Sequence, residues 1–126
     1  MDTDEAAIRA AVLDYFEGWF EGDPVRMERA LHPDLAKRSL SSGRLDSTSA
    51  QEMIEATHRG VGKTRLGEGQ DAEIRVEIQD VYDTIASVLV RSAVYHEYVH
   101  LIRTNEGWKI VNTLWQRTLR GGDGPG

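Results

Sequence analysis

The spacing of apolar residues changes along this chain, from a period of three to four positions to a period of two. Between residues 4 and 21 the apolar side chains recur at helical spacing, while charged residues occupy most of the other positions. The apolar set of this segment is Ile8, Val12, Tyr15, Phe16, Trp19 and Phe20. The pattern predicts an amphipathic helix with one buried face, on which Tyr15 and Trp19 lie.

Two shorter helices are expected next, and each is marked by a capping signal. Asp23 followed by Pro24 is typical of a helix start. This helix is expected to end before the His-Pro pair at residues 32–33, because the residue before a proline disfavours helical angles. Ser49 and Glu52 form a capping box, which predicts a third helix ending near residue 59.

The later part of the chain carries the two-residue period of β-strands. A short strand is expected at 35–40, and residues 85–93 are apolar on both faces, as in a central strand. Residues 74–82 alternate, so that one face would carry Ile74, Val76, Ile78 and Tyr82. The expected fold class is α+β, with three N-terminal helices packed on a strongly curved antiparallel sheet. Such a sheet forms a cone with a pocket at its open end.

Residues 95–118 have two competing interpretations, one as a metal site and one as a β-hairpin. His96-Glu97-Tyr98-Val99-His100 matches the H-E-x-x-H signature of zinc hydrolases, which requires a helix so that both histidines reach one ion. On a strand the two histidines would be about 13 Å apart, too far to share a zinc ion. The segment is rich in β-branched and aromatic residues around a turn at 105–107. We therefore expect the hairpin, and the zinc hydrolase is the remote alternative.

The register of this hairpin decides which side chains face the pocket, since a shift of one residue exchanges the two faces. A two-residue loop, Asn105-Glu106, would place Glu97 and Asn112 on one face, together with Val99, Leu101 and Ile110. A three-residue loop would instead bring Tyr98, His100 and Asn112 together. The two-residue loop is favoured.

Composition narrows the function classes without naming one. With 126 residues the chain has the length of one domain (1–126), whose core is expected at about 4–118, with a flexible glycine-rich tail at 119–126. The net charge of −6 argues against a nucleic-acid partner. The chain has no cysteine and no apolar run of membrane-spanning length, and its acidic first residues lead us to expect no secretory leader. A cytoplasmic protein without membrane contact is expected.

The order of elements resembles that of the nuclear transport factor 2-like (cystatin-like) superfamily. Within it, the putative lumazine-binding branch is similar to three segments of this chain: 32–38 (His-Pro-Asp-Leu-Ala-Lys-Arg), 97–101 (Glu-Tyr-Val-His-Leu) and 108–112 (Trp-Lys-Ile-Val-Asn). The resemblance covers about residues 4–118. It implies a homodimer through the outer face of the sheet and a pocket for a small apolar or heteroaromatic molecule, without a cofactor. Ketosteroid isomerase, scytalone dehydratase and polyketide cyclases share the fold, so a cofactor-free isomerase, dehydratase or cyclase is the alternative.

Five side chains are expected to line the pocket: Tyr15, Trp19, Glu97, Asn112 and Trp115. Tyr15 resembles in position the oxyanion-stabilising tyrosine of ketosteroid isomerase, although a core aromatic with its hydroxyl at the cavity rim also fits. The enzyme alternative would use Tyr15 as a hydrogen-bond donor and Glu97 or His32 as the base. The short strand at 35–40 offers Arg38, Ser39 and Leu40 where an isomerase of that kind needs a carboxylate.

Overall fold

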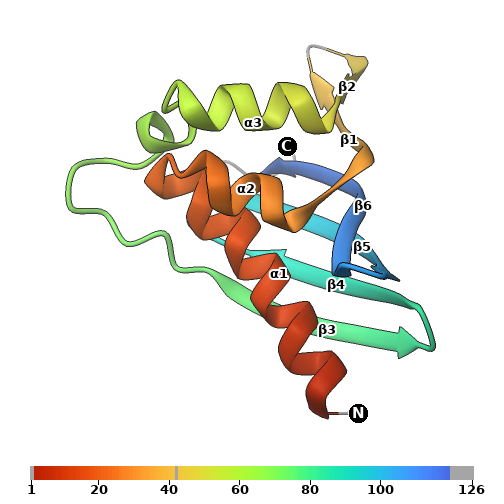
Figure 1. Cartoon of the computed structure of the whole chain (residues 1–126). Helices are drawn as coiled ribbons and strands as arrows, with labels where there is room; N and C mark the ends of the chain where they lie inside the picture. Colours follow the sequence, from red (N-terminus) through yellow and green to blue (C-terminus); the bar gives the residue numbers. More distant parts are fainter. Residues whose placement is uncertain (1, 42, 120–126) are drawn as a thin grey trace.

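The computed structural model describes residues 2–41 and 43–119 of the chain. Within these residues the helices are α1 (Asp2–Glu21), α2 (Pro24–Ala30) and α3 (Ala50–His58), followed by a short 3-10 helix, η1 (Gly62–Arg65). The strands are β1 (Leu31–Ser41), β2 (Arg44–Thr48), β3 (Arg75–Tyr82), β4 (Ile85–Arg91), β5 (Tyr95–Thr104) and β6 (Gly107–Arg117). The α+β class is confirmed (Figure 1). Residues 120–126, most of the tail expected to be flexible, lie outside the described residues.

Both predicted helix starts are confirmed by their hydrogen bonds. The Asp23 carboxylate accepts bonds from the backbone N–H groups of Val25 (3.1 Å) and Arg26 (3.2 Å). At α3 the Ser49 hydroxyl accepts from the N–H of Glu52, whose carboxylate accepts from the N–H of Ser49. These bonds satisfy N–H groups that the first turn of a helix leaves without partners.

The strands form one sheet in the order β2-β1-β6-β5-β4-β3. The expectation of a purely antiparallel sheet was wrong in one respect, because β1 runs parallel to β6. The two-residue period reports which face a residue takes but not the direction of its neighbour, so this pairing had no local signal. A parallel pair needs a long connection, and α3, η1 and four strands lie between β1 and β6 in the sequence. Strand β2, which pairs with β1 through a short turn, was also not predicted.

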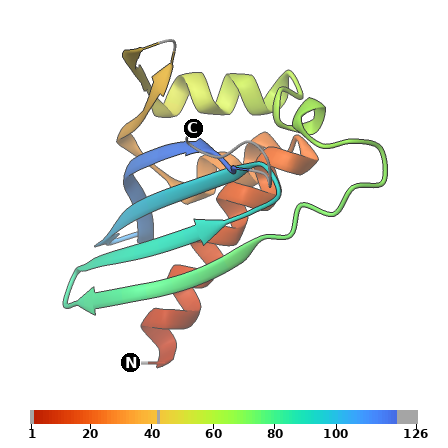
Figure 2. The same ribbon diagram turned by 180° about the vertical axis from the view of Figure 1, so that it is seen from behind.

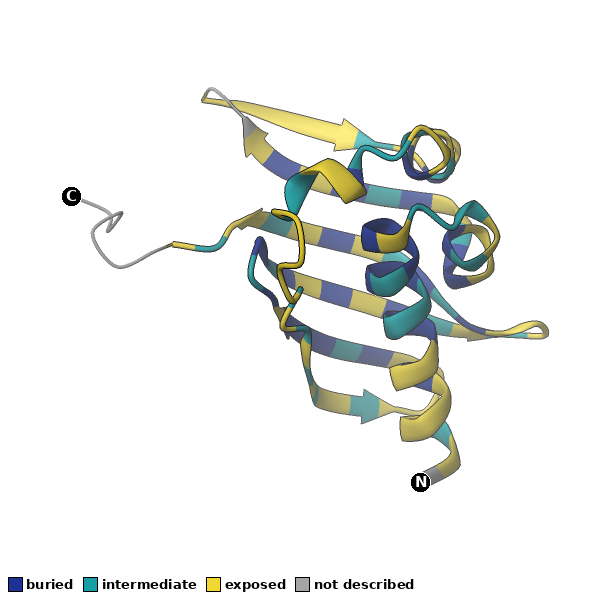
Figure 3. Cartoon of the chain, turned by 90° about the vertical axis from the view of Figure 1, so that its left-hand side faces the viewer, coloured by how far each residue is buried: buried dark blue, intermediate teal, exposed yellow. Residues whose placement is uncertain are grey.

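The helices cover one face of the curled sheet and leave the other face outward. In Figure 2 the outer face of the sheet is toward the viewer and α1 lies behind it. Figure 3 shows buried and exposed positions alternating along the strands. The core lies between α1 and the inner face, and its fully buried members include Ile8, Val12, Met27, Val88, Val90, Val99 and Ile110. In the described residues no helix has both the length and the apolar character of a membrane span.

The β5–β6 hairpin has the predicted two-residue loop but contains an unpredicted irregularity. Thr104 pairs with Gly107 across the loop, which confirms the turn. Farther along, Leu101 pairs with Ile110 while His100 pairs with Asn112, so Val111 is an extra residue in β6. A β-bulge of this kind exchanges the faces of all later residues in its strand. Asn112 therefore lies on the outer face, opposite to the side on which the unbroken alternation placed it.

Strand β3 contains a second register shift, which moves Tyr82. Ile78 pairs with Val88 and Asp80 with Ser87, which leaves Gln79 without a partner in the ladder. The side chain of Tyr82 is consequently 73% exposed, although the alternation from residue 74 placed it with the buried set.

Candidate functional site

Three polar side chains from distant parts of the chain meet on the inner face of the sheet. The Tyr15 hydroxyl donates a hydrogen bond of 2.7 Å to Oε2 of Glu97. Lys37 donates from Nζ to the Tyr15 hydroxyl, and its Nζ lies 3.7 Å from the same Glu97 oxygen. The Glu97 side chain is 1% exposed and that of Lys37 10%. We call Tyr15, Lys37 and Glu97 the inner cluster.

Each member of the inner cluster is placed by the regular pattern of its own element. Tyr15 lies on the buried face of α1. In β1 the inward positions are Leu35, Lys37 and Ser39, and Lys37 pairs with Thr113 of β6. In β5 Glu97 shares the inner face with Val99 and Leu101. A helix and two strands thus hold the three groups on rigid backbone.

Aromatic rings surround the Lys37 ammonium group. Its Nζ lies 4.9 Å from the ring centroid of Tyr15, 5.4 Å from that of Trp115 and 5.7 Å from that of Trp19. The Trp19 indole N–H donates a 2.9 Å hydrogen bond to the Tyr95 hydroxyl, and Tyr95 meets Trp115 edge to face at 5.2 Å. These distances are within the range of cation–π contacts, which favour a positive charge between the rings.

Burial and charge alter the proton affinities of the inner cluster. Burial raises the pKa of Tyr15 well above its usual 10.0, and the charge and hydrogen bond of Glu97 raise it further. Tyr15 therefore keeps its proton and acts as a donor to Glu97. Burial lowers the pKa of Lys37, an effect that the Glu97 carboxylate partly opposes. One further polar atom lies beside the cluster, since Oγ1 of Thr113 is buried and has no hydrogen-bond partner among the described residues.

Of the five side chains expected to line a pocket, the structure brings four together. Tyr15 and Glu97 are in direct contact, and Trp19 and Trp115 both lie within 6 Å of the same Lys37 ammonium, at 5.7 and 5.4 Å from ring centroid to Nζ. Asn112 is not with them, because the bulge at Val111 turns it to the outer face.

His32 also lies apart from the inner cluster. Its Nδ1 accepts a hydrogen bond of 3.0 Å from the backbone N–H of Asp34, which fits the capping role that such a histidine plays before a proline. This contact gives His32 a local structural role.

Lys37, Thr113 and Tyr95 are members of this region that the sequence analysis missed. A signal for Lys37 was present in the two-residue period of 35–40, where Leu35, Lys37 and Ser39 share a face. A carboxylate was the base expected on this strand, whereas the inward position is occupied by the amine of Lys37. Thr113 had no such signal, since it reaches the inner face through the bulge.

The H-E-x-x-H motif lies on strand β5. The zinc-hydrolase alternative requires a helix at this position, so it is wrong. His96 and His100 pair with Gln116 and Asn112 on the outer face, while Glu97 lies on the inner face. Four strand residues separate the two imidazoles by about 13 Å, and the glutamate that should assist the metal lies on the other side of the sheet. Among residues 2–41 and 43–119, no three His, Asp or Glu side chains are grouped as metal ligands.

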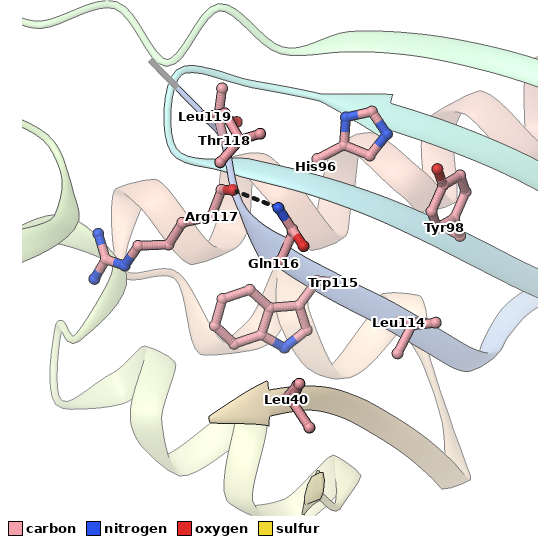
Figure 4. A pocket seen from close by; sticks show the side chains of 9 residues that line it. All are labelled: Leu40, His96, Tyr98, Leu114, Trp115, Gln116, Arg117, Thr118 and Leu119. Atoms are coloured by element: carbon pink, nitrogen blue, oxygen red, sulfur yellow. Dashed lines mark hydrogen bonds between the residues drawn. The ribbon is translucent and has the colours of Figure 1, made fainter. Parts of the chain in front are cut away.

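The surface carries hollows on the outer face and at one end of the sheet. One of about 680 Å³ lies around the last part of β6 and is shown in Figure 4. Two others on the outer face measure about 560 and 310 Å³. A hollow of about 300 Å³ lies between η1 and the end of β6, and we call it the mouth. None of these hollows, all built from described residues, is lined by Tyr15, Lys37 or Glu97.

Comparison with known proteins identifies relatives of this fold. A family model described as putative lumazine-binding matches residues 3–116. No curated protein matches the chain. A nuclear transport factor 2-like protein of unknown function from Silicibacter pomeroyi is 18% identical with a TM-score of 0.73, covering 93% of this chain and 98% of that one.

Two further solved structures are similar to the chain. A protein of the same description from Shewanella baltica is 15% identical with a TM-score of 0.74, covering 94% of this chain and 96% of its own. A ketosteroid isomerase-like protein from Erwinia carotovora is 18% identical with a TM-score of 0.62, covering 91% and 96%. At such identities these likenesses concern the fold.

Proposed function

The chain belongs to the putative lumazine-binding family within the nuclear transport factor 2-like superfamily, and from this premise we propose that it binds a small apolar or heteroaromatic molecule. The observation that carries the proposal is the inner cluster, in which Tyr15, Lys37 and Glu97 are buried against the rings of Trp19 and Trp115. Pockets for small molecules combine such apolar walls with a few convergent polar groups. The aromatic side chains supply the walls, and the cluster supplies groups that orient a ligand.

Stability alone is a weak reason for this arrangement. A buried ion pair such as Lys37–Glu97 loses much of its hydration, and well-packed apolar side chains often serve a core equally well. The unpaired Thr113 hydroxyl adds a further cost that a purely structural core would avoid. Polar groups with shifted pKa values gathered in one region are typical of functional sites.

Titration with the fluorescent apolar probe N-phenyl-1-naphthylamine tests this proposal. The probe is expected to bind one site per chain, and Trp19→Leu is expected to weaken binding because it removes a wall of the site. Tyr98→Ser is the matched control on the outer face, where Tyr98 lines two of the hollows. Circular dichroism verifies that both variants are folded. Binding that is lost in Tyr98→Ser and kept in Trp19→Leu would refute the inner site.

A second candidate function, cofactor-free proton transfer, is favoured by the position of Lys37. An isomerase of the ketosteroid type needs a base on the first strand and a hydrogen-bond donor toward the developing oxyanion. Lys37 lies on the inner face of β1 with a lowered pKa, and Tyr15 keeps its proton. In this candidate the Lys37 amine takes a proton from the carbon next to a carbonyl, and Tyr15 stabilises the enolate oxygen.

Exchange of such carbon-bound hydrogens in D₂O separates binding from catalysis. With a cyclic ketone as the probe, an enzyme would accelerate exchange, and both Lys37→Met and Tyr15→Phe would lower the rate by about 100-fold or more. A binding domain would show no acceleration in any variant, and Tyr15→Phe would weaken probe binding by only about tenfold, as expected for one hydrogen bond.

We propose further that two copies of the chain associate through the outer sheet face. Large apolar side chains are exposed on the strands of this face, with exposures of 72% for Leu40, 65% for Leu45, 52% for Leu114 and 47% for Tyr98. Contact with a second copy would cover these side chains, and a two-fold interface uses the same patch on both subunits. Leu114→Glu is expected to shift the mass measured by analytical ultracentrifugation from two chains to one. A wild-type protein that stays monomeric at a chain concentration of about 100 µM would contradict the proposed dimer.

A further inference from the structure

Two arginines line the mouth. The hollow of about 300 Å³ between η1 and the end of β6 is bordered by Arg65 and Arg117, with Val94 and Leu119 among its apolar neighbours. Within the described residues, neither guanidinium lies within 4.0 Å of a carboxylate. Both arginines therefore bring positive charge to one hollow of a chain whose net charge is −6.

Three other arginines, Arg26, Arg29 and Arg103, do contact carboxylates. Arg26 contacts Asp14, Glu17 and Glu21 at 3.0, 2.7 and 3.5 Å. Arg29 contacts Asp14 at 2.8 Å. Arg103 lies 3.5 Å from Asp4 and 3.6 Å from Asp83. Arg65 is half-buried, so the absence of such a partner concerns a charge that has already lost part of its water.

The positive charges of the mouth influence the pKa values of Lys37 in the inner cluster and of Tyr95 beside it. Arg65 adds to the lowering of the pKa of Lys37 that burial causes. Burial raises the pKa of Tyr95, whereas the positive charges of Arg65 and Arg117 both act to lower it. Tyr95 follows Val94 of the mouth in the sequence and packs edge to face on Trp115. The region therefore holds three basic side chains, Lys37, Arg65 and Arg117, and one carboxylate, that of Glu97.

We propose that the mouth binds the anionic group of an amphipathic aromatic ligand, with Arg65 and Arg117 holding the anion while the rings of the ligand pack toward Trp115 and Tyr95. The inference rests on the proposed binding function and specifies the ligand class as flat aromatic anions, such as carboxylates or sulfonates. Guanidinium groups suit this task because their planar set of N–H donors matches the oxygens of such anions. The apolar border formed by Val94 and Leu119 fits the part of the ligand next to its charge.

A matched pair of fluorescent probes tests the inference. N-phenyl-1-naphthylamine is neutral, and 8-anilino-1-naphthalenesulfonate has the same ring system with one added sulfonate. The sulfonate probe is expected to bind the wild-type protein at least about tenfold more tightly than the neutral one. Arg65→Gln and Arg117→Gln are each expected to weaken the sulfonate probe by about three- to tenfold and to change the neutral probe by less than about twofold. Arg44→Gln on the exposed β2 strand is the control and is expected to change neither.

The two probes also separate the failure of this inference from that of the binding function. If the neutral probe binds and the sulfonate binds no better, or if its affinity is unchanged in both mouth variants, the anion site is refuted and the binding function stands. If neither probe binds the folded wild-type protein, both proposals fail. If Arg44→Gln weakens the sulfonate probe as much as the mouth variants do, the effect is one of overall charge and the anion site is likewise refuted. Raising the salt concentration should weaken the sulfonate probe selectively.

Discussion

The Tyr15 hydroxyl and the Glu97 carboxylate lie 2.7 Å apart on the inner face of the sheet, although 82 residues separate them in the sequence. One comes from the buried face of α1 and the other from the inner face of β5, so the docking of helix on sheet creates the contact. Lys37 of β1 completes the group by approaching both. Such a group, held by three elements of the fold, is pre-positioned rather than assembled by a mobile loop.

The Lys37–Glu97 pair should make Glu97→Gln strongly destabilising. The substitution removes the carboxylate and leaves the Lys37 ammonium buried without a charged partner, which typically costs about 3–5 kcal/mol. Urea unfolding at neutral pH measures the loss in the free energy of unfolding. Glu77→Gln, on the exposed side of β3, is the control and should change this free energy by less than about 0.5 kcal/mol.

Removing both charges should recover part of that stability. In the double variant Lys37→Met/Glu97→Gln no unpaired charge remains, so it should be more stable than Glu97→Gln alone by about 1–3 kcal/mol. A double variant as unstable as the sum of the two single variants would show that the two side chains do not interact.

Tyr15 should make the protein less stable at alkaline pH. Its pKa is raised in the folded state above the usual 10.0, so the unfolded chain releases the proton first as the pH rises. The stabilisation is fully present below pH 10, and above it the free energy of unfolding falls by about 1.4 kcal/mol per pH unit for this group. Tyr15→Phe has no hydroxyl to titrate. The difference in the free energy of unfolding between wild type and this variant should therefore shrink from pH 10 to 11. A difference that stays constant over this range would contradict the burial of an intact hydroxyl.

Gly62 should tolerate no side chain, because η1 packs closely on α1. A Cβ atom at this position would lie 2.2 Å from the backbone oxygen of Trp19 and 2.7 Å from its ring. Gly62→Ala therefore has to displace η1 or Trp19, at a cost of about 1–3 kcal/mol, measured by thermal or urea unfolding. Gly67→Ala is the matched control, because its Cβ would meet only the side chain of Gln70, 3.4 Å from Oε1 and 3.9 Å from Cβ. Equal stability of the two variants would refute the close packing.

The sequence predicted the elements of this fold better than the faces of its strands. Helix starts at Asp23 and Ser49 were predictable because capping depends on residues within one turn. Tyr82 and Asn112 were misplaced because register shifts at Gln79 and Val111 exchange the two faces, and no local pattern marks them. The direction of β1 relative to β6 depends on a pairing between distant segments, so it was not predictable from local patterns either.

The candidate site shows the same division. Tyr15, Trp19 and Glu97 were predictable, since helical spacing and the hairpin loop fix their faces. Trp115 was named as a site residue, but it reaches the inner face only through the bulge at Val111, which the alternation does not predict. Lys37 was within reach of the alternation in β1, but a lysine is rarely expected on a buried face. The role of Arg65 was not predictable, because it depends on how η1 folds against the end of β6.

The three tryptophan indole N–H groups provide the most direct measurement of the central claim, that the inner aromatic region binds a small molecule. In a two-dimensional ¹H–¹⁵N NMR spectrum Trp19, Trp108 and Trp115 each give one indole signal, assigned through Trp19→Phe and Trp115→Phe. Trp19 and Trp115 lie against Lys37, whereas the indole of Trp108 donates a hydrogen bond to Asp4 at the start of α1. On titration with N-phenyl-1-naphthylamine, the signals of Trp19 and Trp115 are predicted to move to saturation while that of Trp108 stays in place. Signals of Trp19 and Trp115 that remain fixed while the probe is bound would contradict the account.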